Sequence, residues 1–329
     1  MIITQTPYRI SLFGGGSDYP LWYLNHGGRV LNFSIDKYCY ISVRTLPPFF
    51  KHKIRVAYSK VETVDAFDEI QHPAVREALR LYAPTQGLEI QHHGDLPAQS
   101  GVGSSSAFAV GILNGIHKLN GITLENKQLA QLAIDFEQKE LKENVGSQDQ
   151  IACALGGLNI IDFQTNGTWR ATSTGLELNS INKINEYLFP IFTGVSRLSS
   201  NVSAELVRNL GSHSRIMQRN IELVEDAINI FKHEADYSGI GELLNESWSI
   251  KRQLNSASVN SSLEEIWAKG MQSGASGGKI LGAGGGGFLL FWVHPEKREK
   301  FMHEFKIGIH VPVRISNGGT QVILDEHAR

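Results

Sequence analysis

The sequence has few cysteines and no long hydrophobic run. Only two cysteines, Cys39 and Cys153, occur among its 329 residues, and each stands in an apolar stretch. Such cysteines are typically reduced and buried, so we expect two free thiols and no disulfide. No stretch of about 18 apolar residues, the length that spans a membrane, is present, so we expect no membrane-spanning helix.

An excess of one charge is also missing. The chain carries 31 Lys and Arg residues against 33 Asp and Glu residues, a formal net charge of −2. Because binding to nucleic acid or to an anionic membrane surface requires a concentrated basic surface, we expect neither partner. Residues 1–10 lack the pattern of a secretion signal, which predicts a cytoplasmic protein. The 12 histidines show no zinc-binding spacing, so no zinc site is expected.

Periodic patterns predict an α+β fold. Up to about residue 180, β-rich runs are interrupted by two helical patterns, one after Ser104 and one over residues 129–136. The β-rich runs are residues 2–4, 9–13, 30–33, 38–45, 54–58, 88–92 and 158–163. After a strand at 187–192, amphipathic helices follow, with apolar spacing over 217–231 and 263–271. The chain then returns to strands near 279–281, 288–293, 311 and 322, with a helix near 295–305.

The length of the chain indicates two domains. Single hydrophobic cores stop growing at about 250–300 residues, and the change from strands to helices falls near the polar segment 179–182. We therefore predict an N-terminal domain of residues 1–182 and a C-terminal domain of residues 183–329.

Glycine, in contrast, is abundant and clustered. The 33 glycines are about a tenth of the chain, against an average near 7%. The first cluster, Gly14–Gly16, ends a strand-like run that contains Arg9 and is followed by Ser17 and Asp18. Such a turn brings backbone close to a ligand, although a plain glycine-rich turn with a capping Asp is the alternative.

The second cluster opens directly into a helix. Its residues are Gly101, Val102, Gly103, Ser104, Ser105 and Ser106. Free amides and hydroxyls at a helix N-terminus form an anion site that suits phosphate, and a serine that also reaches magnesium would complete a nucleotide site. The alternative is a helix cap, which needs only one serine.

The third cluster lies between two predicted strands. Gly282, Gly284 and Gly287 match the dinucleotide pattern G-x-G-x-x-G, but residues 288–293 form a strand where that pattern requires a helix. The preceding Lys279 resembles a P-loop lysine, but the glycine and the hydroxyl residue of that motif are missing. We therefore expect a loop that another backbone or a ligand approaches closely.

Carboxylates follow the second helical pattern. Phosphate and magnesium at the serines would require one carboxylate on the metal and a group near the attacking hydroxyl. Glu137, Glu140 and Asp149 are the candidates. Helix glutamates are more commonly solvated, and Asp149, beside an apolar segment, has the alternative of a buried cap.

Together these residues resemble the three signature motifs of the GHMP kinases. The motifs are Pro-x-Arg-Ile with a following Gly-Gly-Gly-Ser-Asp, Pro-x-x-x-Gly-x-Gly-Ser-Ser-Ser-Ala, and Lys-Ile-x-Gly-Ala-Gly-Gly-Gly-Gly-Phe. They occur in the family's order and span nearly the whole chain. The first motif is more similar to that of the D-glycero-D-manno-heptose 7-phosphate kinases than to the Gly-Glu-His-Thr-Asp of galactokinases.

The resemblance implies a fold and a set of roles. The fold has an N-terminal domain like ribosomal protein S5 domain 2 and a ferredoxin-like C-terminal domain with added helices. Ser105 and Glu137 match magnesium ligands, and Asp149 matches the residue that takes the acceptor's proton, with Arg9 beside it. Residues 101–106 match the phosphate loop for ATP. The implied substrate-binding residues are Gly15, Gly16, Ser17, Asp18, Gly284 and Gly285.

The resemblance implies an ATP- and Mg²⁺-dependent kinase that phosphorylates the anomeric hydroxyl of a heptose 7-phosphate. A phosphorylated acceptor needs a second anion site, for which Arg197, after Thr193 and Gly194 at a strand end, is one candidate and Arg29 another. Its only predicted partner is a small sugar phosphate, and the chain is expected to be a monomer or a homodimer. The alternatives are a kinase for an unphosphorylated sugar or mevalonate, and a non-catalytic binding protein of the same fold.

Overall fold

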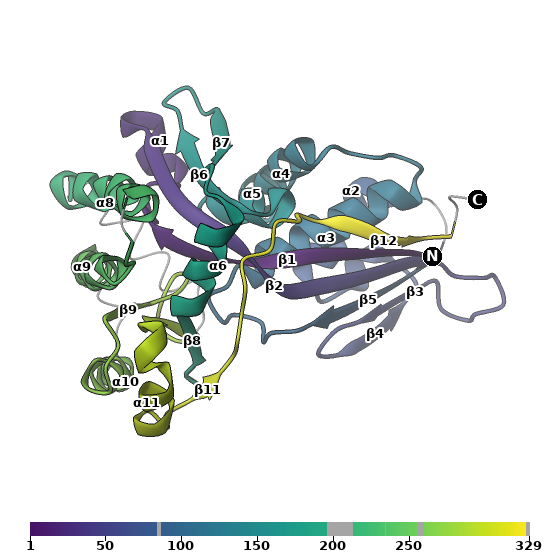
Figure 1. Cartoon of the computed structure of the whole chain (residues 1–329). Coiled ribbons are helices and arrows are strands. Elements are labelled where there is room, and N and C mark those ends of the chain that lie inside the picture. The colour runs from purple at the N-terminus through teal and green to yellow at the C-terminus, as the bar shows by residue number, and fades with distance from the viewer. Residues whose placement is uncertain (84–86, 196–212, 234, 255–259, 327–329) are drawn as a thin grey trace.

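The computed structural model describes residues 1–83, 87–195, 213–233, 235–254 and 260–326, which form two β-sheets with helices packed around them (Figure 1). One sheet has eight strands and the other has four. This mixture confirms the predicted α+β class. Among the described residues, every helix is too short or too polar to cross a membrane.

The first sheet is built around the two longest strands of the N-terminal half. Its strands are β1 (Ile2–Phe13), β2 (Gly28–Thr45), β3 (Ile54–Ala57), β4 (Val61–Val64), β5 (Leu88–Gly94), β6 (Leu158–Phe163), β7 (Trp169–Ser173) and β12 (Gln321–Asp325). The order is β12-β1-β2-β5-β3-β4, with β6 also on β2 and β7 on β6. All pairings are antiparallel except that of β3 with β5.

Strand β1 is continuous where two separate strands were predicted. Pro7, which has no backbone N–H, interrupts the sequence pattern but not the strand. Pairing with β12 ends at Gln5, and the register with β2 shifts between Pro7 and Arg9. A proline is tolerated at such an irregular, singly paired position, so β1 runs on to the Gly14–Gly16 turn.

Six helices accompany this sheet. They are α1 (Pro20–His26), α2 (Pro73–Tyr82), α3 (Ser104–Leu119), α4 (Asn126–Asp135), α5 (Gln148–Leu155) and α6 (Leu178–Tyr187), with short turns η1 (Phe67–Glu69) and η2 (Phe136–Glu140). The predicted apolar stripe of α3 is confirmed, since Phe108, Ile112 and Ile116 are buried. Gly111 and Gly115 let α3 approach the sheet closely, because a Cβ there would lie 3.0–3.1 Å from side chains of β1 and β2.

The C-terminal half supplies the second sheet. Its strands are β8 (Leu188–Phe192), β9 (Gly277–Ile280), β10 (Phe288–Trp292) and β11 (Ile309–His310), in the order β11-β8-β10-β9. The helices are α8 (Ser214–His233), α9 (Gly239–Leu254), α10 (Ser261–Gln272) and α11 (Arg298–Glu304), with the turn η4 (Pro295–Lys297). Tyr187, predicted to begin a strand, is instead the last residue of α6.

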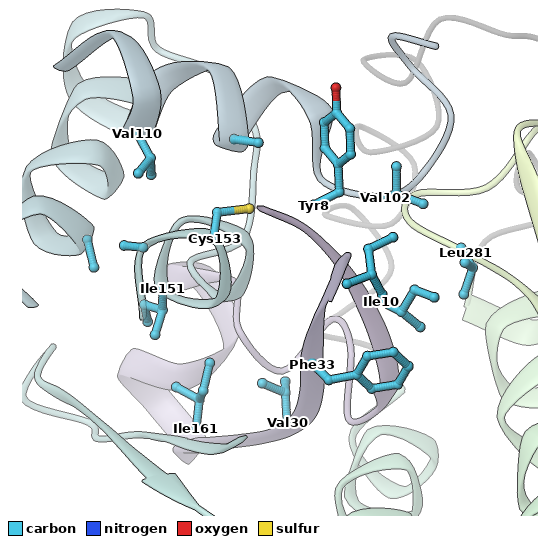
Figure 2. Close-up of a cluster of buried hydrophobic side chains, with 14 of the residues drawn as sticks. Tyr8, Ile10, Val30, Phe33, Val102, Val110, Ile151, Cys153, Ile161 and Leu281 are labelled. Atoms are coloured by element: carbon cyan, nitrogen blue, oxygen red, sulfur yellow. The ribbon is translucent and has the colours of Figure 1, made fainter. Parts of the chain in front are cut away.

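The two halves share a hydrophobic core. Figure 2 shows Leu281, which follows β9, beside Ile10 of β1 and Phe33 of β2, and all three belong to one buried cluster. The last strand, β12, returns to β1, so that Met1 and the end of β12 lie at one end of the molecule (Figure 1). The polar segment 179–182 is helical rather than a linker. The division at residues 182 and 183 stays a prediction, and it falls inside α6.

Candidate active site

A pocket lies where β1, the N-terminal ends of α3 and α5, and residues of α9 and β9 come together. Ten of the residues that were assigned a site role from the sequence line it: Arg9, Gly15, Gly16, Asp18, Gly101, Gly103, Ser104, Ser105, Asp149 and Gly284. Seven others lie outside its lining: Ser17, Val102, Ser106, Glu137, Thr193, Gly194 and Gly285. Arg197 is outside the described residues.

Arg9 and Asp149 form a two-pronged ion pair in this pocket. Nε of Arg9 donates to Oδ1 of Asp149 at 2.7 Å, and Nη2 donates to Oδ2. Nη1 donates to the carbonyl of Gly101 at 2.7 Å, which ties the pair to the glycine–serine loop. Burial alone would lower the pKa of Arg9, but Asp149 raises it. Arg9 is only 4% exposed and Asp149 25%, so the carboxylate is oriented by Arg9 yet faces the pocket.

The conformation of the glycine–serine loop suits the close approach of a ligand, and its serines do not cap α3. Gly103 is the N-cap of α3 in the left-handed conformation, with φ of 74°, and the cap has no side-chain hydrogen bond. Ser104 accepts from the amide of Gln99, and Ser106 donates to Glu137. The serines therefore do not act as the N-cap, and the first amides of α3 lie beside Ser104 and Ser105 at the pocket. This arrangement fits the phosphates of a nucleotide.

Glu137 lies buried behind this loop, at 1% exposure. Its carboxylate accepts a hydrogen bond from Oγ of Ser106 at 2.7 Å and another from the amide of Gln150. Burial raises the pKa of Glu137 to about 8. The serine in contact with Glu137 is thus Ser106, whereas the resemblance assigns Ser105, which lines the pocket.

These oxygen atoms fit a magnesium ion. Magnesium is usually held by one or two carboxylates together with substrate phosphates rather than by a complete protein cage. Among the described residues, no group of three or more His, Cys, Asp or Glu side chains is arranged so that it could hold a metal ion by itself. A cation near Glu137 would stabilise its buried carboxylate, so Glu137 and a loop serine would hold the ion with the nucleotide.

Asp18 joins the first glycine turn to the start of α5. Its Oδ1 accepts from the amide of Gly16 at 2.9 Å, and its Oδ2 accepts from the amide of Gln148 at 3.3 Å. Burial, and next the charge of Asp149, raise the pKa of Asp18 to about 6. A Cβ on Gly146 would lie 1.8 Å from Oδ2 of Asp18, so a larger residue there would displace the Asp18 carboxylate. Asp18 therefore brings the Gly14–Gly16 turn close to Gln148, the residue that precedes Asp149.

The third glycine cluster packs against the second. A Cβ on Gly282 would lie 2.5 Å from Cα of Gly101, and one on Gly287 would lie 2.2 Å from the carbonyl of Ser100. The strand β10 follows, so the expected close approach of backbones is confirmed and a dinucleotide fingerprint is excluded. Thr193 donates from its amide and its hydroxyl to the carbonyl of Gly287. Thr193 thus braces this loop.

The sequence reasoning missed two lysines that line the pocket. Lys279 was considered only as part of a P-loop, and Lys251 of α9 was not singled out. Lys279 stands three residues before Gly282, the first glycine of the third cluster, and this position could have indicated a place in the pocket. Lys251 has no comparable signal, because a lysine on an amphipathic helix normally faces water.

Arg29, a candidate for a second anion site, is engaged elsewhere. Its Nε donates to Asp162 at 2.6 Å, and Nη1 lies 3.5 Å from Glu225. Arg29 does not line the pocket. Two acidic partners reduce the attraction of Arg29 for a phosphate, so the geometry gives this candidate no support, and the assignment stays a prediction.

Two segments of the chain match known domains. Residues 69–157 match the GHMP kinases N terminal domain, and residues 217–308 match the GHMP kinases C terminal domain. Together these segments cover more than half of the chain. The chain belongs to the GHMP kinases.

Relatives of this GHMP kinase match most of its length. It is 26% identical over 311 residues to a D-glycero-alpha-D-manno-heptose 7-phosphate kinase of Campylobacter jejuni, covering 90% of this chain and 91% of that one. A mevalonate kinase of Thermococcus sibiricus is 26% identical over 75% of this chain and 74% of its own. A crystal structure of a D-glycero-D-manno-heptose 1-phosphate kinase from Bacteroides thetaiotaomicron has a TM-score of 0.80 at 21% identity, covering 99% of each chain.

The GHMP kinase fold predicted from the motifs is therefore confirmed. Family membership makes the chain an ATP-dependent kinase with a small-molecule substrate, and GHMP kinases typically use Mg²⁺. The assignment of each site residue rests on the pocket geometry and on the motifs, and it stays a prediction.

Proposed function

We propose that this GHMP kinase transfers the γ-phosphoryl group of ATP to the anomeric O1 hydroxyl of D-glycero-D-manno-heptose 7-phosphate. The product would be the 1,7-bisphosphate, for the synthesis of nucleotide-activated heptose. The observation that carries the chemistry is the Arg9–Asp149 pair, which presents a carboxylate to the pocket beside the glycine–serine loop. The similarity to the Campylobacter heptose 7-phosphate kinase over 90% of the chain supports the choice of acceptor.

The glycine–serine loop would bind the nucleotide. The first amides of α3 and the hydroxyls of Ser104 and Ser105 hold the phosphates in place. Magnesium, when held by Glu137 and Ser105, would neutralise charge on the β- and γ-phosphates. Positioning and charge neutralisation dominate the catalysis of phosphoryl transfer, so this loop would supply a large part of the rate.

Asp149 would act as the base. It accepts the proton of the O1 hydroxyl while the bond from O1 to the γ-phosphorus forms and the bond to the bridging oxygen of ADP breaks. Arg9 is a positioning residue for Asp149, and its positive charge also stabilises the transferring phosphoryl group. Because Arg9 additionally contacts Gly101, the base and the nucleotide loop keep a fixed relative position.

The turn after β1 would bind the sugar. Asp18 is held by the amides of Gly16 and Gln148 and lines the pocket, so its remaining lone pairs can accept bonds from sugar hydroxyls. Gly15 and Gly284 allow the sugar to approach backbone closely.

Release of ADP tests the proposed function. Purified protein with MgATP is given D-glycero-D-manno-heptose 7-phosphate, the same heptose without phosphate, fucose, galactose and mevalonate in turn. We expect the highest kcat/KM with the heptose 7-phosphate. A higher value with another acceptor reassigns the substrate, and release of no ADP with any of them favours a non-catalytic binding role.

A further inference from the structure

Two lysines form a cationic wall of the pocket. Lys279, on β9, is 7% exposed, and its Nζ donates to the carbonyl of Leu12 at 2.5 Å and to Oγ of Ser247 at 3.3 Å. Lys251, on α9, donates to the carbonyl of Gly282. Both line the pocket, and they come from the C-terminal half, whereas the Arg9–Asp149 pair comes from the N-terminal half.

Neither lysine has a carboxylate partner among the residues that the structure describes. Arg9, the neighbouring cation, is already paired with Asp149. Burial and the positive charge of Arg9 lower the pKa of Lys279 to about 7, and burial, Lys279 and Arg9 lower that of Lys251. Both lysines lack a carboxylate partner, and a bound anion would favour their charged forms by raising these pKa values, so this part of the pocket suits an anionic ligand.

The nucleotide phosphates have their own binding surface at the start of α3. Lys279 contacts Leu12, which leads into the turn that ends with Asp18, whereas Lys251 contacts Gly282, whose loop packs on Gly101. Asn220 of α8 contacts the same turn, since its Nδ2 donates to the carbonyl of Gly15 at 2.8 Å. This places Lys279 beside the turn that is expected to bind the acceptor.

Two unsatisfied amide oxygens belong to residues that lie beside Gly15. Oδ1 of Asn220 and Oε1 of Gln148 are buried and have no hydrogen-bond partner among the described residues, although both residues line the pocket. Buried acceptors of this kind are satisfied when a ligand supplies hydroxyl donors. A polyhydroxylated acceptor that also carries an anionic group would supply hydroxyl donors to these two oxygens and an anion to the two lysines.

We propose that Lys251 and Lys279 bind the phosphate group that the acceptor already carries, and that they select a phosphorylated sugar over its unphosphorylated form. This inference rests on the proposed function and deepens it by assigning the second anion site. It replaces Arg29, which is paired with acidic residues, and it does not require Arg197.

Matched acceptors test the inference. The variants Lys251→Met and Lys279→Met remove the charge and keep an unbranched apolar side chain, and Lys300→Met, 73% exposed on α11, is the control. For each protein, kcat/KM is measured with the heptose 7-phosphate and with the same heptose without phosphate, together with the KM for ATP. We expect each pocket variant to lose at least tenfold with the phosphorylated sugar, and about twofold or less with the other sugar and with ATP.

Other outcomes overturn the inference. Equal losses of kcat/KM with both sugars, or a raised KM for ATP, would mean that the lysines act on the nucleotide or the transferring phosphoryl group. An unchanged preference for the phosphorylated over the unphosphorylated sugar would mean that the lysines bind no phosphate. If the unphosphorylated heptose reacts too slowly, calorimetric binding of the two sugars decides, since only the wild type should favour the phosphorylated one. A variant that does not fold is replaced by Lys→Gln at the same position. Wild-type protein that releases no ADP with any sugar phosphate refutes the proposed function instead, which separates the two failures.

Discussion

Nε of Arg9 lies 2.7 Å from Oδ1 of Asp149, across 140 residues of sequence, and the same guanidinium holds the carbonyl of Gly101. This contact links the carboxylate that would take the acceptor's proton to the loop that would hold the nucleotide. General bases in enzymes contribute about 10²–10⁴-fold to the rate. The Arg9–Asp149 pair is therefore the part of the pocket on which turnover should depend most.

We expect Asp149→Asn to lower kcat by about 10²–10⁴-fold with little change in nucleotide binding, because the amide keeps the shape and loses the base. Steady-state kinetics and ATP-analogue calorimetry measure the two effects. Asp162→Asn is a matched control, since Asp162 also pairs with an arginine and is also 25% exposed, but it does not line the pocket. Near-normal turnover in the Asp149 variant would remove this residue from the mechanism.

Adjacent serines should have separable effects. Ser105 lines the pocket, so Ser105→Ala should raise the magnesium concentration needed for half-maximal turnover. Ser106 donates to buried Glu137, so Ser106→Ala should lower the free energy of unfolding by about 1–3 kcal/mol. Magnesium titrations and chemical denaturation check both. A shifted magnesium titration in the Ser106 variant alone would transfer the ligand role to Ser106.

A substitution of Gly146 should weaken binding of the acceptor sugar. An added Cβ would lie 1.8 Å from Oδ2 of Asp18, so Gly146→Ala must displace Asp18 or the start of α5. We expect a loss of about 1–3 kcal/mol of stability and a larger rise in KM for the sugar than for ATP. Gly318→Ala is the control, because a Cβ there meets nothing within 4 Å. Equal KM changes for both substrates would contradict the assignment of Asp18 to the sugar.

The preference for a phosphorylated acceptor should depend on pH. Burial and Arg9 lower the pKa of Lys279 to about 7, so the free enzyme loses this charge as the pH rises from 7 to 9. The ratio of kcat/KM for heptose 7-phosphate to that for heptose should therefore fall over this range. In Lys279→Met this titrating group is absent, so the ratio for that variant should change less with pH. A wild-type ratio that rises with pH would exclude this role.

Local patterns were sufficient to predict most elements and the three glycine clusters. The burial of Met217, Val224, Ile228 and Phe231 follows directly from their helical spacing, and Gly282 and Gly287 lie against backbone as expected. The free, buried state of Cys39 and Cys153 is likewise confirmed.

Features that depend on long-range packing could not be predicted. Pro7 does not end β1, because the strand is paired on one side only at that point. The contact of Ser106 with Glu137 depends on how η2 meets α3, and no spacing reveals it. The position of Lys251 in the pocket lining likewise depends on how α9 packs against β9, and a helical sequence pattern does not determine that packing.

Product analysis by phosphorus NMR tests the central claim most directly. Wild-type protein is incubated with MgATP and D-glycero-D-manno-heptose 7-phosphate, and the position of the new phosphate is read from its coupling to the sugar protons. The account predicts ADP and one new resonance coupled to the anomeric proton, from a 1,7-bisphosphate, with far slower formation by Asp149→Asn. A phosphate on any other hydroxyl, or formation of no sugar bisphosphate, would contradict it.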